Sequence, residues 1–80
     1  MRACAVVPAF NEEARVAGVV LGALDRLPKV IVVDDGSSDG TAGAAERAGA
    51  EVLRHRVNRG KGAALRTGME RAFASGFDAA

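Results

Sequence analysis

The chain has 80 residues, enough for one small domain, and its 49% hydrophobic and 26% charged residues are typical of a folded protein. Its net charge of +1 gives no support for nucleic-acid binding, its single cysteine excludes an intrachain disulfide, and no apolar stretch approaches the ~20 residues of a membrane span. We therefore expect a cytoplasmic protein with no nucleic-acid partner, in which Cys4 is a core residue.

The first part of the chain predicts a strand and then a helix. Ala3–Val7 is a continuous apolar run, typical of a strand covered on both faces, and we expect Pro8 to end it because proline has no N–H for a sheet ladder. Asn11 predicts a helix N-cap, with Glu12–Glu13 in the first turn beside the positive end of the helix dipole. The helix should stop at Pro28. Its apolar face would consist of Val16, Val19, Val20, Ala23, Leu24 and Leu27.

A second strand and helix follow. Val30–Val33 is β-branched throughout and predicts a buried central strand, which leads into a turn over Asp34–Gly40. Thr41–Ala48 predicts a short helix, and Gly49 is placed to end it in the left-handed conformation. Small side chains would let this helix pack closely: Ala44, Ala45 and Ala48.

The last part repeats the alternation. Glu51–Arg54 predicts a third strand, Val57–Gly60 a loop and Lys61–Ser75 a third helix, after which Phe77–Ala80 resembles the opening of a fourth strand. The apolar face of this helix would hold Ala64, Leu65, Gly68, Met69, Ala72 and Phe73. The order βαβαβα predicts the α/β class, with a Rossmann-like parallel sheet and right-handed crossovers. We expect the chain to be the front part of a larger domain.

Three polar segments follow the predicted strands, where parallel α/β sheets bind ligands. They are Pro8–Glu13, Asp34–Asp39 and the basic stretch Arg54–Lys61. Carboxylates can accept from base and ribose donors or help to hold a divalent cation, and basic side chains can meet a diphosphate. The pattern fits a nucleotide cradle, but a solvated turn that caps the next helix and a solvated basic edge fit it as well.

Two common phosphate-binding motifs are absent. A Walker loop ending at Gly60-Lys61 would need glycine where His55 stands, and the dinucleotide fingerprint would need glycine in place of Leu65. His55 has no metal-binding partners at ligand spacing, so we expect it at the surface.

Three segments together resemble the N-terminal part of an inverting glycosyltransferase of family 2, which has the GT-A fold. They are Val6–Glu13, Val30–Thr41 and Asn58–Ala64, and the resemblance covers essentially the whole chain. The nearest branch resembles the dolichyl- or polyprenyl-phosphate sugar synthases. The resemblance implies that residues 1–80 are an incomplete nucleotide-sugar-binding domain, cut before a fourth strand and its Asp-x-Asp motif.

The resemblance also assigns roles to residues. Pro8, Phe10 and Glu12 would line the nucleotide pocket, with Phe10 beside the base, where tyrosine is frequent, and Glu12 on the base or ribose. Val33 and Asp35 match positions that touch the nucleotide. This assignment requires the carboxylates of Glu12 and Asp35 to lie side by side.

The resemblance also implies roles for residues outside the nucleotide pocket. Asp34 would fix the turn, and Lys61 would reach the donor diphosphate. Mg²⁺ or Mn²⁺ is expected with its ligands beyond residue 80. The resemblance implies transfer of a sugar from a UDP- or GDP-sugar to a polyprenyl phosphate, by a protein that is peripheral at the membrane in its longer form. The 80 residues alone should bind nucleotide weakly and show no turnover.

Two other readings stay open. The chain could be a non-catalytic α/β module that binds nucleotides or forms oligomers. A nucleotidyltransferase is disfavoured because it needs a glycine-rich loop where Pro8–Asn11 stands.

Without a fourth strand, Ala3–Val7 would be an apolar sheet edge, which predicts self-association of this chain.

Overall fold

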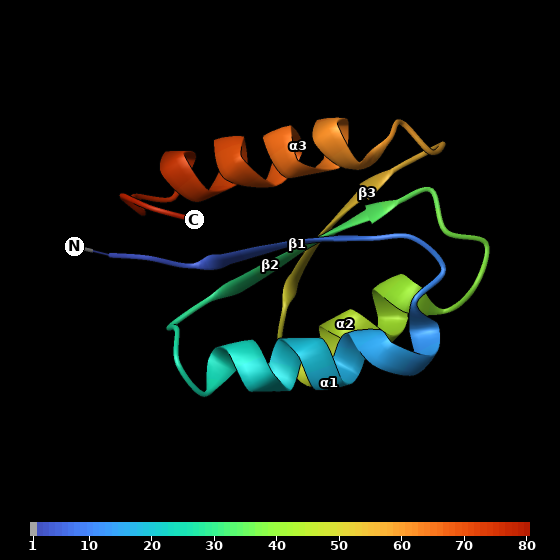
Figure 1. Ribbon diagram of the computed structural model, residues 1–80, viewed down its shortest axis with the longest axis horizontal. Coiled ribbons are helices and arrows are strands. Elements are labelled where there is room, and N and C mark those ends of the chain that lie inside the picture. Colours follow the sequence, from blue (N-terminus) through green and yellow to red (C-terminus); the bar gives the residue numbers. More distant parts are fainter. Residues whose placement is uncertain (1) are drawn as a thin grey trace.

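Three parallel strands form the sheet in the computed structural model, which describes residues 2–80 (Figure 1). The strands are β1 (Ala5–Ala9), β2 (Val30–Asp35) and β3 (Glu51–His55), in the spatial order β1-β2-β3. They alternate with α1 (Glu13–Leu24), α2 (Thr41–Ala48) and α3 (Lys61–Ala74). The expected α/β class with Rossmann-like βαβαβα order is confirmed.

The helices cover both faces of the sheet. In Figure 1, α1 and α2 lie on one face and α3 lies on the other. Right-handed crossovers explain this arrangement, because the chain moves in one direction from β1 to β3 and then turns back towards β1. After α3 the chain returns alongside the first strand, where Ala3 pairs with Ala79 and the Cys4 N–H donates to the Ala79 carbonyl at 3.1 Å.

The core divides into two layers because side chains of a strand alternate between the faces of the sheet. All six residues of β2 are buried. Val30 and Val32 pack towards α1 and α2, whereas Ile31 and Val33 pack towards α3. Cys4 is buried in the α3 layer, as expected, and burial raises the pKa of its thiol. None of the helices in residues 2–80 is long and apolar enough to cross a membrane.

Three predicted boundaries near β1 are wrong, the first being its start, which lies at Ala5 instead of Ala3. Pro8 lies inside β1, paired with Val33, instead of ending it. The Ala5 N–H points to β2 and the Cys4 N–H points to the opposite side, so the ring nitrogen of Pro8 also points away from β2 and no ladder bond is lost. Asn11 is not the N-cap: it has a φ of 50°, and Glu12 takes that position.

The helices present narrower apolar faces than the spacing predicts. Val19 is 49% exposed, Met69 is 43% exposed and Phe73 is 50% exposed, so these three are not core residues. The sheet contacts of α3 are instead made by the small residues Ala64, Gly68 and Ala72. Gly68 is the tightest point, because a Cβ atom there would lie 2.3 Å from Val6 Cγ1 and 3.1 Å from Val33 Cγ2.

The close approach of α3 predicts the outcome of one substitution. We expect Gly68→Ala to lower the free energy of unfolding by about 1–3 kcal/mol, because the new methyl group overpacks the core. Urea denaturation followed by circular dichroism measures this. Gly62→Ala is the matched control in the same helix, since a Cβ there has nothing within 4 Å. We expect between no change and a gain of about 1 kcal/mol for the control. Equal effects of both substitutions would contradict the packing argument.

Candidate functional site

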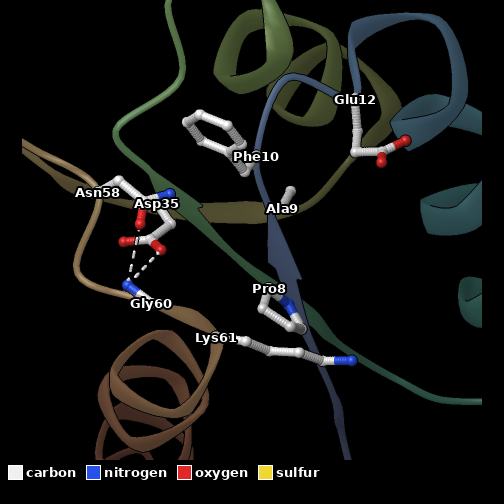
Figure 2. A pocket seen from close by; sticks show the side chains of 8 residues that line it. All are labelled: Pro8, Ala9, Phe10, Glu12, Asp35, Asn58, Gly60 and Lys61. Carbon is white, nitrogen blue, oxygen red and sulfur yellow. Dashed lines mark hydrogen bonds between the residues drawn. The ribbon is translucent and has the colours of Figure 1, made fainter.

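A cavity of about 350 Å³ opens beyond the carboxyl ends of the strands (Figure 2). Its walls come from β1 and the turn after it, from the end of β2 and from the loop that leads into α3. The lining residues are Pro8, Ala9, Phe10, Glu12, Asp35, Asn58, Gly60 and Lys61. The cavity therefore lies where open α/β sheets bind ligands. It adjoins β1, the strand to which the chain returns after α3.

The carboxylate of Asp35 is the best-anchored group in this cavity. Its Oδ1 atom accepts from the Arg59 N–H at 2.9 Å and lies 2.8 Å from His55 Nδ1, and its Oδ2 atom accepts from the Gly60 N–H at 2.9 Å. The Arg59 N–H, with His55 as a second cause, lowers the pKa of Asp35 below its ordinary value of 3.8. An ionised carboxylate has about four acceptor positions, so one on Oδ2 is left for a ligand.

His55 is not at the surface, and that prediction is wrong. Its side chain is 6% exposed and lies between Asp35 and Thr67, with Nε2 2.8 Å from the Thr67 hydroxyl. The strand β3 runs one residue further than predicted and pairs His55 with Asp35. The signal was the alternation of the strand: Leu53, two residues earlier, packs into the α3 layer, and His55 shares its face.

Asp34 has the structural role that the sequence predicts. Its Oδ1 atom accepts from the Ser37 N–H at 3.1 Å and so fixes the turn after β2. Gly36 has a φ of 77°, and a Cβ atom there would lie 2.4 Å from the Asn58 backbone nitrogen. Only glycine therefore lets this turn lie against the loop before α3, which forms the adjoining cavity wall.

A clamp between the turns after β1 and β2 was not predicted. The Asn11 Oδ1 atom accepts from the Ser38 N–H at 2.9 Å, and the Asn11 N–H donates to the Ser37 hydroxyl at 2.9 Å. Glu13 lies in the first turn of α1, as expected, but its Oε1 atom also accepts from the Gly40 N–H at 3.0 Å. The polar side chains in both turns were the available signal, and the clamp fixes the cavity rim on that side.

Of the other predicted site residues, Phe10 and Glu12 line the cavity and Val33 does not. Phe10 lines the cavity and is 47% exposed, so a face of its ring is free to contact a ligand. Glu12 also lines the cavity, but Figure 2 shows its carboxylate pointing away from Asp35, towards the far side of the turn. The expectation that these two carboxylates lie side by side is therefore wrong. Val33 is fully buried and does not line the cavity, because its side chain packs under α3.

The basic stretch contributes one cation to the cavity. Lys61 begins α3, is exposed, and its side chain extends past Pro8 (Figure 2). Arg54 lies outside the cavity, with Nη2 3.6 Å from Glu46 Oε1. The positive end of the α3 dipole lies on the same side as Lys61, so this side of the cavity favours an anion.

The residues present do not form a metal site by themselves. Within residues 2–80, no three His, Cys, Asp or Glu side chains are grouped so that they could hold a metal ion. The carboxylates of Asp34 and Asp35 are directed to N–H groups of their own chain.

The anchoring of Asp35 predicts how stability depends on pH. Because the folded-state pKa lies below 3.8, the stabilisation by Asp35 is fully present above that value and is lost as the pH falls through the folded-state pKa. We expect Asp35→Asn to be destabilising at pH 7, with a difference from the original chain that shrinks below about pH 4. Urea midpoints from pH 2.5 to 7 measure this. Glu70→Gln, on the exposed side of α3, should show no such trend; a constant deficit for Asp35→Asn at all pH values would contradict the anchoring.

Comparison with curated proteins gives relatives of greater length. The chain is 40% identical over 68 residues to the glycosyltransferase AglJ of Haloferax volcanii. The aligned region covers 84% of this chain and 22% of that protein. It is 48% identical over 67 residues to an uncharacterized protein of Methanocaldococcus jannaschii, with 81% of this chain and 27% of that protein covered. The chain therefore spans about a quarter of the length of these relatives.

Comparison with solved structures also finds longer proteins, of which this chain matches only a part. Glucosyl-3-phosphoglycerate synthase of Mycobacterium tuberculosis matches with a TM-score of 0.70 and 33% identity over 80% of this chain and 27% of that one. It has been solved with Mn²⁺ and UDP-glucose. Mannosyl-3-phosphoglycerate synthase of Rubrobacter xylanophilus matches with a TM-score of 0.59 and 40% identity over 68% of this chain and 19% of that one. The profile described as glycosyl transferase family 2 matches residues 4–75, and the chain belongs to this family.

Proposed function

We propose that this chain is the nucleotide-binding part of a glycosyltransferase that uses a UDP- or GDP-sugar as donor. The observation that carries the proposal is the composition of one cavity in a family 2 fold. An exposed aromatic ring, an anchored carboxylate and a cation line it together: Phe10, Asp35 and Lys61. The synthase of M. tuberculosis that matches this chain binds UDP and UDP-glucose, which supports the same ligand class here.

The cavity divides into parts that suit the parts of a nucleotide. The ring of Phe10 offers a stacking face for the base, and the free acceptor position of Asp35 can take an N–H or O–H donor of the base or ribose. Lys61 and the start of α3 suit the diphosphate. Glu12 stands at the other side of the cavity, so we propose that it meets a ribose hydroxyl there, separately from Asp35.

The proposed reaction joins an acceptor oxygen to the anomeric carbon of the sugar and releases the nucleoside diphosphate. In this reaction the chain binds the base, orients the donor and places Lys61 beside the charge that develops on the leaving group. Asp34 and Asp35 are engaged by N–H groups, so we propose that Mg²⁺ or Mn²⁺ is held by residues further along the longer protein.

The acceptor is proposed to be a phosphate-bearing molecule, namely a polyprenyl phosphate at the cytoplasmic face of a membrane. The basis is the resemblance of the three motifs to polyprenyl-phosphate sugar synthases. The matched structures are named for 3-phosphoglycerate instead, so both acceptors belong in the assay. In the protein extended to the length of its relatives, radiolabelled sugar should enter the lipid fraction with polyprenyl phosphate. Incorporation with 3-phosphoglycerate alone would overturn this choice of acceptor.

Nucleotide titration tests the donor site. Isothermal titration of the 80-residue chain with UDP, GDP and uridine should show millimolar binding of UDP or GDP. Phe10→Ala should weaken nucleotide and nucleoside about fivefold or more, since stacking contributes about 1–3 kcal/mol per base. Lys61→Ala should weaken UDP about threefold to tenfold and leave uridine unchanged.

The matched control is Arg56→Ala, which removes an exposed cation of the same loop that does not line the cavity. Its UDP affinity should equal that of the original chain. If neither UDP nor GDP binds at millimolar concentration, the donor site is wrong and the non-catalytic module becomes the better reading.

We also propose that the isolated chain self-associates through the outer edge of β1. In residues 2–80 the Val6 position of this edge faces no strand, and unpaired apolar edges pair readily. Sedimentation velocity over a hundredfold concentration range should give a rising average mass. A monomer at all concentrations would refute self-association and leave the donor site untouched.

A further inference from the structure

The loop before α3 places a side-chain amide beside the anchored carboxylate of the cavity. The Gly60 N–H donates both to Asp35 Oδ2 at 2.9 Å and to Asn58 Oδ1 at 3.1 Å (Figure 2). Because one N–H group binds both side chains, the carboxamide of Asn58 and the carboxylate of Asp35 lie next to each other. Both residues line the cavity, but only Asp35 has had a role so far.

The contact with Gly60 fixes which way the carboxamide of Asn58 is turned. A backbone N–H can only donate, so the amide oxygen faces Gly60 and the NH₂ group lies on the other branch of the side chain. Figure 2 shows this nitrogen on the side of the Phe10 ring. Within the residues that the structure describes, it takes part in no hydrogen bond, so its hydrogens are available to a ligand.

The backbone that carries this amide is held on two sides. The turn at Gly36 lies against it so closely that a Cβ atom on Gly36 would be 2.4 Å from the Asn58 nitrogen. The next two N–H groups of the loop, those of Arg59 and Gly60, bind the Asp35 carboxylate at 2.9 Å each. Asn58 itself is exposed, so a ligand can reach its NH₂ group without having to order the loop.

The two side chains form a pair of fixed polarity. The free position on Asp35 can only accept, and the NH₂ group of Asn58 can only donate. Uracil and guanine match such a pair, because each has a ring N–H next to a carbonyl, which is O4 in uracil and O6 in guanine. In the same pose, cytosine and adenine turn a ring nitrogen without hydrogen to Asp35 and an amino group to Asn58, so like groups face each other.

We propose that Asn58 selects the base of the nucleotide: its NH₂ group donates to O4 of uracil or O6 of guanine, while Asp35 accepts from the adjacent ring N–H. This rests on the proposed function. The placement supports a contact with the base instead of the diphosphate. In Figure 2 the Phe10 ring lies towards the Asn58 amide, whereas the Lys61 side chain extends past Pro8, away from it.

The first experiment needs no variant. Isothermal titration of the 80-residue chain with UDP, GDP, CDP and ADP compares ligands that share the diphosphate, so the ratios of their affinities report the base alone. UDP should bind about fivefold or more tightly than CDP, or GDP than ADP by the same factor. Equal binding of all four would overturn the role of Asn58 and leave the donor site intact. Failure of both UDP and GDP to bind would overturn the proposed function and the base selection with it.

The second experiment separates a contact with the base from support of the loop. Asn58→Asp keeps an oxygen for the Gly60 N–H but exchanges the donor for an acceptor, and its charge acts on every diphosphate alike. Asn58→Ala should lower the preference for UDP over CDP, or for GDP over ADP, about threefold to tenfold. Asn58→Asp should lower it further, because a carboxylate accepts from the amino group of cytosine or adenine.

The matched control is Val57→Ala, which trims a neighbouring side chain that is 67% exposed and does not line the cavity. It should keep the preference of the original chain, and circular dichroism checks that each variant is folded. An equal loss for all four nucleotides in both Asn58 variants would show that Asn58 only supports the loop, and would overturn the proposal.

Discussion

The contacts of one carboxylate connect most parts of the candidate site. Asp35 ends the central strand, and the backbone N–H groups of Arg59 and Gly60 bind it at 2.9 Å each. These contacts hold the loop before α3 against the sheet edge, and His55 extends them to Thr67 within α3. A buried carboxylate is stable only when hydrogen bonds replace its lost hydration, so the loop geometry and the ionisation of Asp35 depend on each other.

The cavity combines a fixed frame with accessible groups. The Asn11 clamp to Ser38 holds the turns after β1 and β2 together, and Gly36 lets the second turn lie against the loop before α3. Phe10 and Lys61 are exposed on this frame. A ligand can therefore gain contacts from both side chains without having to order the backbone that carries them, which lowers the entropic cost of binding.

Local sequence patterns predicted the fold well because they report local physics. The limits of α2 and the left-handed Gly49 after it agree with the structure, since turn chemistry and helix capping act over a few residues. The buried β2 followed from its unbroken apolar run, whereas the turn-fixing role of Asp34 was what the family resemblance implied. The position of the ligand-binding edge followed from the order of strands and helices alone.

The sequence by itself determined the order of elements and the family, because periodicity and motif spacing are properties of the chain. Only the tertiary structure decided that His55 is buried, that Val33 is sealed under α3 and that Glu12 points away from Asp35. These placements depend on the pairing of β3 with β2, on the face that α3 covers and on the turn geometry at Asn11. Such contacts join residues far apart in the sequence, so no local pattern records them.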